Sequence, residues 1–279
     1  MVRIACGFCA AVILVSCYES AAAQWVTPRA QDYLFVTNSV DPRGLWVNPA
    51  GMGVTGTASI MAELSTVSSG SDVRVDQFSL GLYSGGMALG YRSARPEFEA
   101  NFSELKIAST YPFEQGTVGF SATRYSQDSV SAQGFDIGAV FVPNSRFQAG
   151  LVIRNIGRPT LLTSQLPLEG SLGLQLTGRR FQIAGEASSR ERLGIGNDGY
   201  DFSYRIGSRF SPSRNTPAQI LATAGFDSNF QIRQIHLGVS VGRTRRVIAV
   251  ATASVSGGTV AADHFSAAFL AVNPATGRR

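Results

Sequence analysis

The stretch Asp41-Pro42-Arg43-Gly44-Leu45-Trp46-Val47-Asn48-Pro49-Ala50-Gly51 decides how the rest of the chain is interpreted. Its Asx-Pro pairs and glycines are turn formers, because Asx side chains bond back to the backbone and proline fixes φ, so a strand is not expected here. The stretch nevertheless carries Leu45 and Trp46, which need a protected place to pack. Short alternating strands follow it over residues 54–272. A compact non-strand segment before a long run of strands favours a plugged β-barrel.

The chain after this stretch alternates apolar residues with small or polar ones between turn signals, which is typical of strands with two unlike faces. In residues 134–142, Phe135 and Ile137 alternate with Asp136 and Gly138. Two segments, 72–83 and 230–241, break phase and indicate bulges or misplaced limits. The pattern predicts fourteen strands, at 54–66, 73–83, 86–93, 101–111, 116–125, 134–142, 147–156, 168–177, 180–188, 201–210, 218–227, 230–242, 245–255 and 262–272.

The predicted fold class is all-β: an antiparallel transmembrane β-barrel of about fourteen strands with a short N-terminal plug, since single-chain barrels have an even strand number. The alternative is a soluble β-sandwich that buries its apolar face in a core. Two features favour the barrel. The polar face is built from Gly, Ser, Thr and Arg, as in a lumen, and the strands approach the 9–11 residues that cross a bilayer.

Residues 1–23 resemble a secretory signal, with Arg3, an apolar run at 4–16 and Ala21-Ala22-Ala23 before Gln24. In an alternative interpretation, Leu14-Val15-Ser16-Cys17 resembles a lipobox with Cys17 acylated. All three cysteines lie in this segment, so a chain cleaved before Gln24 would hold no disulfide and no Cys-based metal site. We therefore expect a signal peptide at 1–23, a plug segment at 24–53, the barrel at 54–272 and a polar tail at 273–279.

The stretch from Asp41 to Gly53, after an export signal and before many alternating strands, resembles the N-terminal signature of the FadL/PorV-type outer-membrane barrels. Asn48-Pro49-Ala50-Gly51 carries the resemblance, and the longer form beginning at Arg43 is closer to the PorV/PorQ branch. The resemblance implies a fourteen-stranded barrel with an N-terminal plug, exported through the periplasm to the bacterial outer membrane. The plug-motif residues are Asp41, Arg43, Gly44, Trp46, Asn48, Pro49, Ala50 and Gly51.

For function, the resemblance to PorV/PorQ implies a non-enzymatic barrel that supports protein export or surface attachment, or serves a structural role. Its partners would be outer-membrane lipid and secretion-system proteins. The runner-up is a passive channel for a hydrophobic ligand, as in the fatty-acid transporters, and a third possibility is a secreted soluble or lipid-anchored β-protein. A transporter should have an apolar pocket between plug and wall and a gap or kink in the wall. A secretion partner should be plugged without such a pocket.

The sequence offers little catalytic or metal-binding chemistry. His236 and His264 are the only histidines, which excludes a multi-His metal site. His264 and Ser266 share a strand face, but no acid that would orient the imidazole can be identified. We therefore predict no catalytic residue, no metal and no cofactor. A group of carboxylates near the first strands is interpreted as solvated rather than as a cluster: Asp32, Asp41, Asp72, Asp76, Glu97, Glu99 and Glu104.

The net charge of +5 comes almost wholly from arginine, because Lys106 is the only lysine. The arginines are scattered singly along strands, so nucleic-acid binding is not expected. Those on polar faces either line a lumen that favours anions or pair across strands with Asp136, Glu186 and Asp201. The candidate lumen charges are Arg154, Glu186, Arg205 and Arg209.

Overall fold

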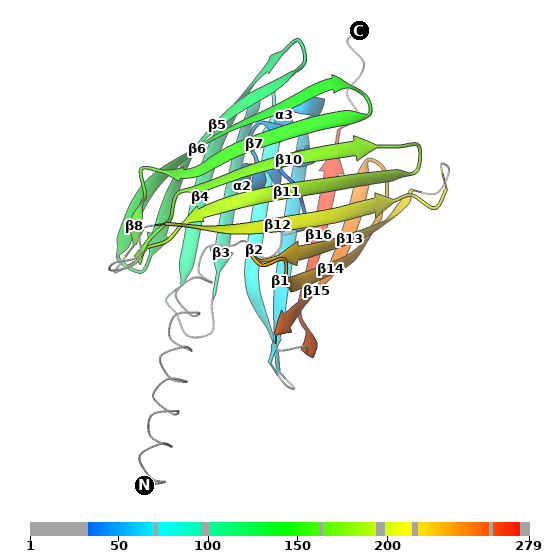
Figure 1. Cartoon of the computed structure of the whole chain (residues 1–279). Helices are drawn as coiled ribbons and strands as arrows, with labels where there is room; N and C mark the ends of the chain where they lie inside the picture. Colours follow the sequence, from blue (N-terminus) through cyan, green and yellow to red (C-terminus); the bar gives the residue numbers. More distant parts are fainter. Residues whose placement is uncertain are drawn as a thin grey trace.

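Fourteen antiparallel strands close into one barrel, in the order β1-β16-β15-β14-β13-β12-β11-β10-β7-β6-β5-β4-β3-β2 (Figure 1). The computed structural model describes residues 33–69, 72–95, 101–161, 164–193, 199–213, 217–256 and 259–273. Pairing of β1 with β16 completes the wall, so no edge strand remains in the ring. The proposed signal peptide with Cys17 and all of the polar tail except Asn273 lie outside the described residues.

All fourteen predicted strands are present, and most of their limits agree with the sequence pattern to within a few residues. The wall strands are β1 (Ser59–Ser69), β2 (Asp72–Ser84), β3 (Met87–Ala94), β4 (Phe102–Phe113), β5 (Gly116–Gln127), β6 (Val130–Asn144), β7 (Phe147–Ile156), β10 (Glu169–Thr177), β11 (Phe181–Glu191), β12 (Tyr200–Phe210), β13 (Ala218–Phe226), β14 (Ile232–Val241), β15 (Arg245–Ser256) and β16 (Thr259–Val272). A small hairpin of β8 (Thr160–Leu161) and β9 (Ser164–Gln165) lies between β7 and β10.

The first strand differs most from its prediction, since it begins at Ser59 and not at residue 54. Residues Gly51–Thr55 continue the plug as helix α3, which Gly56 ends with a left-handed φ of 61°. Helix α2 spans Gly44–Val47. Neither of these short helices, nor any other helix of the described ranges, has the length and apolar character needed to cross a membrane.

The two segments that break phase in the sequence contain register shifts. Between β1 and β2 the pairing steps from Ser65–Gln77 to Thr66–Val75, which leaves Asp76 as an extra residue. Between β13 and β14 it steps past Arg233 in the same way. An extra residue reverses the alternation of faces on one side of the bulge, which explains the broken pattern.

The apolar face of the strands points outward. On β10, Leu172 and Leu174 are 56 % and 52 % exposed, whereas Ser171 and Gln175, which flank this pair in the sequence, are buried inside. The same alternation recurs around the ring, where the exposed outer residues are mainly Leu, Ile, Val and Phe. A soluble sandwich would bury this face, so the wall is that of a transmembrane β-barrel.

The two ends of the barrel differ in their connections. At one end, called here the turn end, β2–β3, β4–β5 and β6–β7 are joined by two residues each. At the other, called the loop end, twelve residues join β7 to β10 and eight join β11 to β12. The β7–β10 connection folds back into the mouth, because Leu161 and Leu166 are buried against Phe102 and Tyr125. It therefore covers the β4–β6 side of the loop end.

The inner wall is bare where it faces the plug. Three pairs of glycines stand directly opposite each other across neighbouring strands: Gly81–Gly90, Gly119–Gly138 and Gly150–Gly173. A methyl group at Gly138 would lie 2.0 Å from the Asn48 Oδ1 atom, and one at Gly119 would lie 2.4 Å from the Ala50 nitrogen. Backbone and side-chain atoms of the plug therefore occupy the space that wall side chains would fill on an ordinary strand.

This contact generates a prediction for glycine substitutions. Gly138→Ala and Gly119→Ala should each destabilise the barrel by about 1–3 kcal/mol, because the added methyl overpacks the plug. The readout is the temperature at which folded, fast-migrating protein disappears from a denaturing gel. Gly185→Ala is the matched control, since a methyl there meets its nearest heavy atom only at 3.9 Å. Equal thermal loss in all three variants would contradict the proposed fit.

Candidate functional site

The lumen is filled by residues 33–56, which form the plug seen inside the wall (Figure 1). Leu45 and Trp46 of α2 are buried against wall residues that include Met61, Tyr83 and Leu270. These are the two apolar side chains for which the sequence predicted a protected packing site. Their burial in a common cluster with wall residues is expected to contribute several kcal/mol, at about 1.5–3 kcal/mol for each large side chain.

Asn48 joins the plug to the wall through its side-chain amide. Its Nδ2 atom donates to the Val36 carbonyl at 2.8 Å within the plug, and to the wall carbonyls of Ala139 at 3.2 Å and Leu151 at 3.4 Å. Its Oδ1 atom accepts from the Ala50 nitrogen at 3.1 Å. The residue is fully buried, so every one of these bonds is made without competition from solvent.

The other small residues of the motif allow close packing inside the plug. A methyl group at Gly44 would lie 2.4 Å from the Ser39 carbonyl oxygen, and one at Gly51 would lie 2.4 Å from the Ser39 hydroxyl. Both helices therefore rest directly on the turn around Ser39. Pro49 and Ala50 lie against the opposed wall pair Gly119 and Gly138, where their backbone and ring atoms take the place of wall side chains.

Asp41 and Arg43 form a buried ion pair within the plug. The Arg43 Nε atom donates to Asp41 Oδ1 at 2.8 Å, and the guanidinium also donates to the Tyr33 hydroxyl and lies over its ring at 5.5 Å from the ring centre. Burial alone would raise the pKa of Asp41, but the charge and hydrogen bonds of Arg43 outweigh it and lower that pKa. Arg209 of β12 is electrostatically coupled to the same pair.

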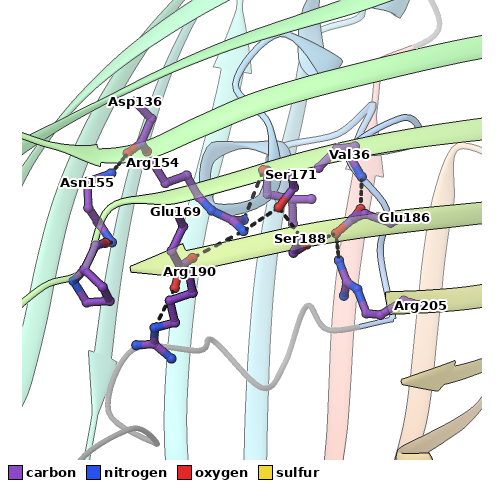
Figure 2. Close-up of polar contacts among 12 residues, drawn as sticks. Val36, Asp136, Arg154, Asn155, Glu169, Ser171, Glu186, Ser188, Arg190 and Arg205 are labelled. Atoms are coloured by element: carbon purple, nitrogen blue, oxygen red, sulfur yellow. Dashed lines mark hydrogen bonds and ion pairs between the residues drawn. The ribbon is translucent and has the colours of Figure 1, made fainter. Parts of the chain in front are cut away.

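Glu186 and Arg205 hold a second part of the plug, as Figure 2 shows. Glu186 Oε2 accepts from the Val36 backbone nitrogen at 2.8 Å. The two residues stand opposite each other on β11 and β12 and form an ion pair. The Arg205 guanidinium also lies 5.5 Å from the centre of the Phe35 ring. Both lumen charges therefore contact plug residues.

Arg154 makes a third attachment. Its guanidinium donates to the Val47 carbonyl at 3.3 Å. It also pairs with Glu169 at 3.4 Å (Figure 2). Glu169 also pairs with Arg190 at 3.2 Å, because it stands between the two arginines on adjacent strands. One carboxylate thus serves two guanidinium groups. The sequence allowed two interpretations of these charges, as groups that line the lumen or as cross-strand pairs. Both are correct here, because the charges face the lumen and are also paired across strands.

The remaining predicted partners pair differently. Asp136 binds Lys106 at 2.6 Å, and Asp201 binds Arg192 at the rim. Arg233 pairs with Asp227 at 2.7 Å. The sequence did not single out Lys106 as a site residue. Its inward position on β4, in phase with buried Glu104, is the signal that could have found it.

A cavity of about 390 Å³ lies between the plug and the loop end, and is called here the vestibule. Trp46 and Val47 contribute to its lining from the plug. Arg92 lies over the Trp46 ring at 4.5 Å from its centre and pairs with Glu104 at 2.9 Å. The charged residues of its lining are Arg92, Glu104, Lys106, Asp136, Arg154, Glu169, Arg190, Arg205, Asp227 and Arg233.

The wall beside the vestibule is incomplete between β12 and β13. In the described residues, β12 pairs with β13 only from Tyr204 to Phe210, so its first residues extend beyond the end of β13. Phe202, Tyr204 and Phe226 line the vestibule at this place. The Tyr204 ring stacks on Phe230 of the β13–β14 connection at 4.7 Å between ring centres. The vestibule thus has an aromatic border where the wall is short.

The chain was compared with known families, sequences and structures. No family model matches the chain, and no curated protein matches its sequence. The toluene transporter TodX of Pseudomonas putida is similar in structure, with a TM-score of 0.56 at 11 % identity, covering 86 % of this chain and 96 % of that chain. A bacterial polysaccharide outer membrane secretin is similar with a TM-score of 0.50 at 9 % identity, covering 78 % and 99 %. A Pseudomonas aeruginosa FadL homologue gives 0.49 at 12 %, covering 90 % and 97 %.

The fold is that of an outer-membrane β-barrel. The predicted resemblance to FadL-type barrels is confirmed at the level of the fold, because TodX shares it over nearly its whole length. The PorV/PorQ branch stays a prediction. At these identities the likeness concerns the arrangement of strands and does not extend to the ligand of any of these proteins.

The described residues give no support for a metal centre. Within them, no three His, Cys, Asp or Glu side chains lie close enough to hold an ion. Asp32, Glu97 and Glu99 of the carboxylate group lie outside the described ranges. The interpretation of this group as solvated is wrong for Asp41 and Glu104, which are buried and paired with arginines. His264 and Ser266 are buried inside the barrel, where the Ser266 hydroxyl lies 3.2 Å from the hydroxyl of Ser65.

Asn48 provides a test of plug attachment. Asn48→Asp keeps the size of the side chain but places a carboxylate against three carbonyl oxygens, so the barrel should lose about 1–3 kcal/mol. The plug should also open intermittently, which single-channel recording in planar bilayers detects as current steps absent from the parent protein. Asn144→Asp is the control, because Asn144 Oδ1 only accepts hydrogen bonds from backbone nitrogens. Silent recordings and unchanged stability for Asn48→Asp would show that the amide does not fasten the plug.

The Asp41–Arg43 pair predicts a pH dependence. Because the pKa of Asp41 is lowered in the folded protein, its stabilising contribution is complete above the ordinary aspartate pKa and is lost as the pH falls through the lowered value. Asp41→Asn should therefore flatten the decline of the unfolding temperature between about pH 5 and pH 2. Asp201→Asn, which changes an exposed carboxylate at the rim, should leave that decline as it is. An unaltered acid profile for Asp41→Asn would refute the assignment.

Proposed function

We propose that this protein is a plugged, non-enzymatic outer-membrane barrel of the PorV/PorQ kind, which supports protein export or surface attachment by presenting its loop end to a partner. The observation that carries the proposal is the attachment of the plug. Asn48 of the plug donates to a wall carbonyl, while Glu186 and Arg154 of the wall bind backbone atoms of the plug. All three side chains are buried or half-buried. A lumen closed in this way suits a docking platform better than an open pore.

The vestibule supports the same role through its chemistry. Its charged groups are arranged as ion pairs, including Arg92–Glu104, Lys106–Asp136 and Glu169 with two arginines. A hydrocarbon ligand would desolvate these pairs without replacing their interactions with water, which is unfavourable. A polypeptide segment can exchange those interactions for its own amides and side chains. In barrels of this class the longer connections are extracellular, so the vestibule faces outward.

A passive channel for hydrophobic small molecules is the second candidate, and two observations favour it. The chain shares its fold with a toluene transporter over 96 % of that protein. The short wall between β12 and β13 also has an aromatic border of Phe202, Tyr204 and Phe226, as a side exit into lipid would need. The charged lining of the vestibule is the feature that places this candidate second.

A deletion strain separates the two functions. Loss of the gene should reduce the proteins released or displayed at the cell surface and leave uptake of a hydrophobic solute such as toluene or a fatty acid unchanged. Complementation with Arg190→Gln, which changes a vestibule charge, should restore export only partly. Arg158→Gln, which changes a paired rim arginine outside the vestibule, should restore it fully. A normal set of exported proteins combined with reduced uptake would replace this proposal with the channel.

A further inference from the structure

The two ends of the barrel differ in charge. In the described residues, the connections at the turn end contain four arginines and one acid, namely Arg146, Arg179, Arg180, Arg243 and Glu114. The described connections at the loop end contain three arginines and two acids, namely Arg95, Arg158, Arg192, Asp128 and Asp227. The turn-end connections are therefore the more basic of the two.

The arginines at the two rims also differ in their partners. At the loop end, Arg158 pairs with Glu191 at 2.8 Å, and Arg192 pairs with Asp201. At the turn end, no carboxylate of the described residues forms a salt bridge with Arg179 or Arg180, and both are exposed. Charges that are left unneutralised at a membrane rim attract anionic groups from the lipid.

A shallow groove on the outer wall lies beside these two arginines. It is lined by Arg179, Arg180, Phe181 and Phe210. The two phenylalanines stand opposite each other on β11 and β12 and are 50 % and 45 % exposed. The Phe181 ring folds over Gly178, where a methyl group would lie 2.8 Å from the ring. An apolar floor thus ends directly at two cationic side chains.

The backbone holds this arrangement in place. The Ser211 nitrogen donates to the Arg180 carbonyl at 2.7 Å, and the Thr177 nitrogen donates to the Arg146 carbonyl at 2.7 Å. These bonds tie three neighbouring turns together, so Arg146 stands on the turn next to Arg179 and Arg180. Arg146 is likewise exposed. The groove therefore has a third cation nearby and a fixed backbone frame.

We propose that this groove binds an anionic glycerophospholipid of the leaflet at the turn end. An acyl chain lies across Phe181 and Phe210, and the headgroup phosphate binds the guanidinium groups of Arg179 and Arg180. Arginine suits this role because its planar donors match phosphate oxygens in pairs. Its long stem also lets the charge reach the headgroup level from the edge of the apolar wall.

The position of the groove selects the source of the phosphate. Short turns mark the periplasmic side of such barrels, so the turn end lies in the leaflet built from glycerophospholipids. A lipid A phosphate, which belongs to the other leaflet, would meet the loop end, where Arg158 and Arg192 are already paired with carboxylates. The inference rests on the membrane-embedded barrel and is independent of the proposed role in export.

Native mass spectrometry of the detergent-solubilised barrel tests the site. Dimyristoylphosphatidylglycerol should bind more tightly than the zwitterionic phosphatidylcholine with the same chains. Arg179→Gln combined with Arg180→Gln should weaken phosphatidylglycerol binding by about fivefold for each arginine removed, at about 1 kcal/mol per charge. Phe181→Ser should weaken the binding of both lipids. Heat-modifiable migration of each variant confirms that it is folded.

Arg158→Gln combined with Arg192→Gln is the matched control, because it removes the same charge from the opposite rim. This variant should bind phosphatidylglycerol like the parent protein. An equal loss in the control would show that binding follows the net charge alone, and would overturn the site. Tighter retention of lipid A than of phosphatidylglycerol by the parent protein would overturn the choice of lipid. Equal binding of phosphatidylglycerol and phosphatidylcholine would contradict the proposal that the two arginines select an anionic lipid.

Discussion

Contact between the plug and the glycine backbone of the inner wall is the constraint on which the rest of the structure depends. A plug of two short helices can fill a fourteen-stranded lumen only if the wall yields space, and opposed glycine pairs provide it. The same absence of side chains lets the Asn48 amide approach main-chain carbonyls on β6 and β7. Glycine in the wall therefore determines both how closely the plug packs and where Asn48 forms its hydrogen bonds.

The polar groups of the plug explain why the lumen carries charge. Short helices leave most of their backbone groups without partners inside the helix, and the segment before them has no regular structure. Buried groups of this kind need external partners. Glu186 accepts from the Val36 nitrogen and Arg154 donates to the Val47 carbonyl. Each charge is in turn paired on the wall, because removal of one partner would leave the other uncompensated in a confined space.

Much of this fold was accessible from the sequence, because strands and turns are local signals. Alternation of period two located all fourteen wall strands, and the turn formers around Trp46 identified a segment that could not be a strand. The predicted start of β1 was wrong, because residues 51–55 fold as α3 although their sequence carries no helix signal. This helix packs against the wall, and a local sequence pattern carries no information about such tertiary contacts.

The site was less accessible because it depends on register. Glu169 bridges Arg154 and Arg190 only because the three stand in line on β7, β10 and β11. A shift of one residue would send the carboxylate to the lipid face, and strand limits read from sequence carry errors of that size. Glu186 and Arg205 were singled out as inward charges, yet their common attachment to the plug needed the position of Val36. Single residues could be predicted, but not their partners.

The pairing of charges also separates the inside of the barrel from its turn-end rim. Inside, carboxylates stand between arginines, so the vestibule presents alternating charge that can exchange partners with an incoming polar segment. At the turn end, arginines border an apolar groove without described carboxylate partners. In the proposed function, a partner engages the loop end while the plug stays attached to the wall. Under the proposed lipid binding, the lipid at the opposite rim would stabilise the folded barrel, including the strands against which the plug packs.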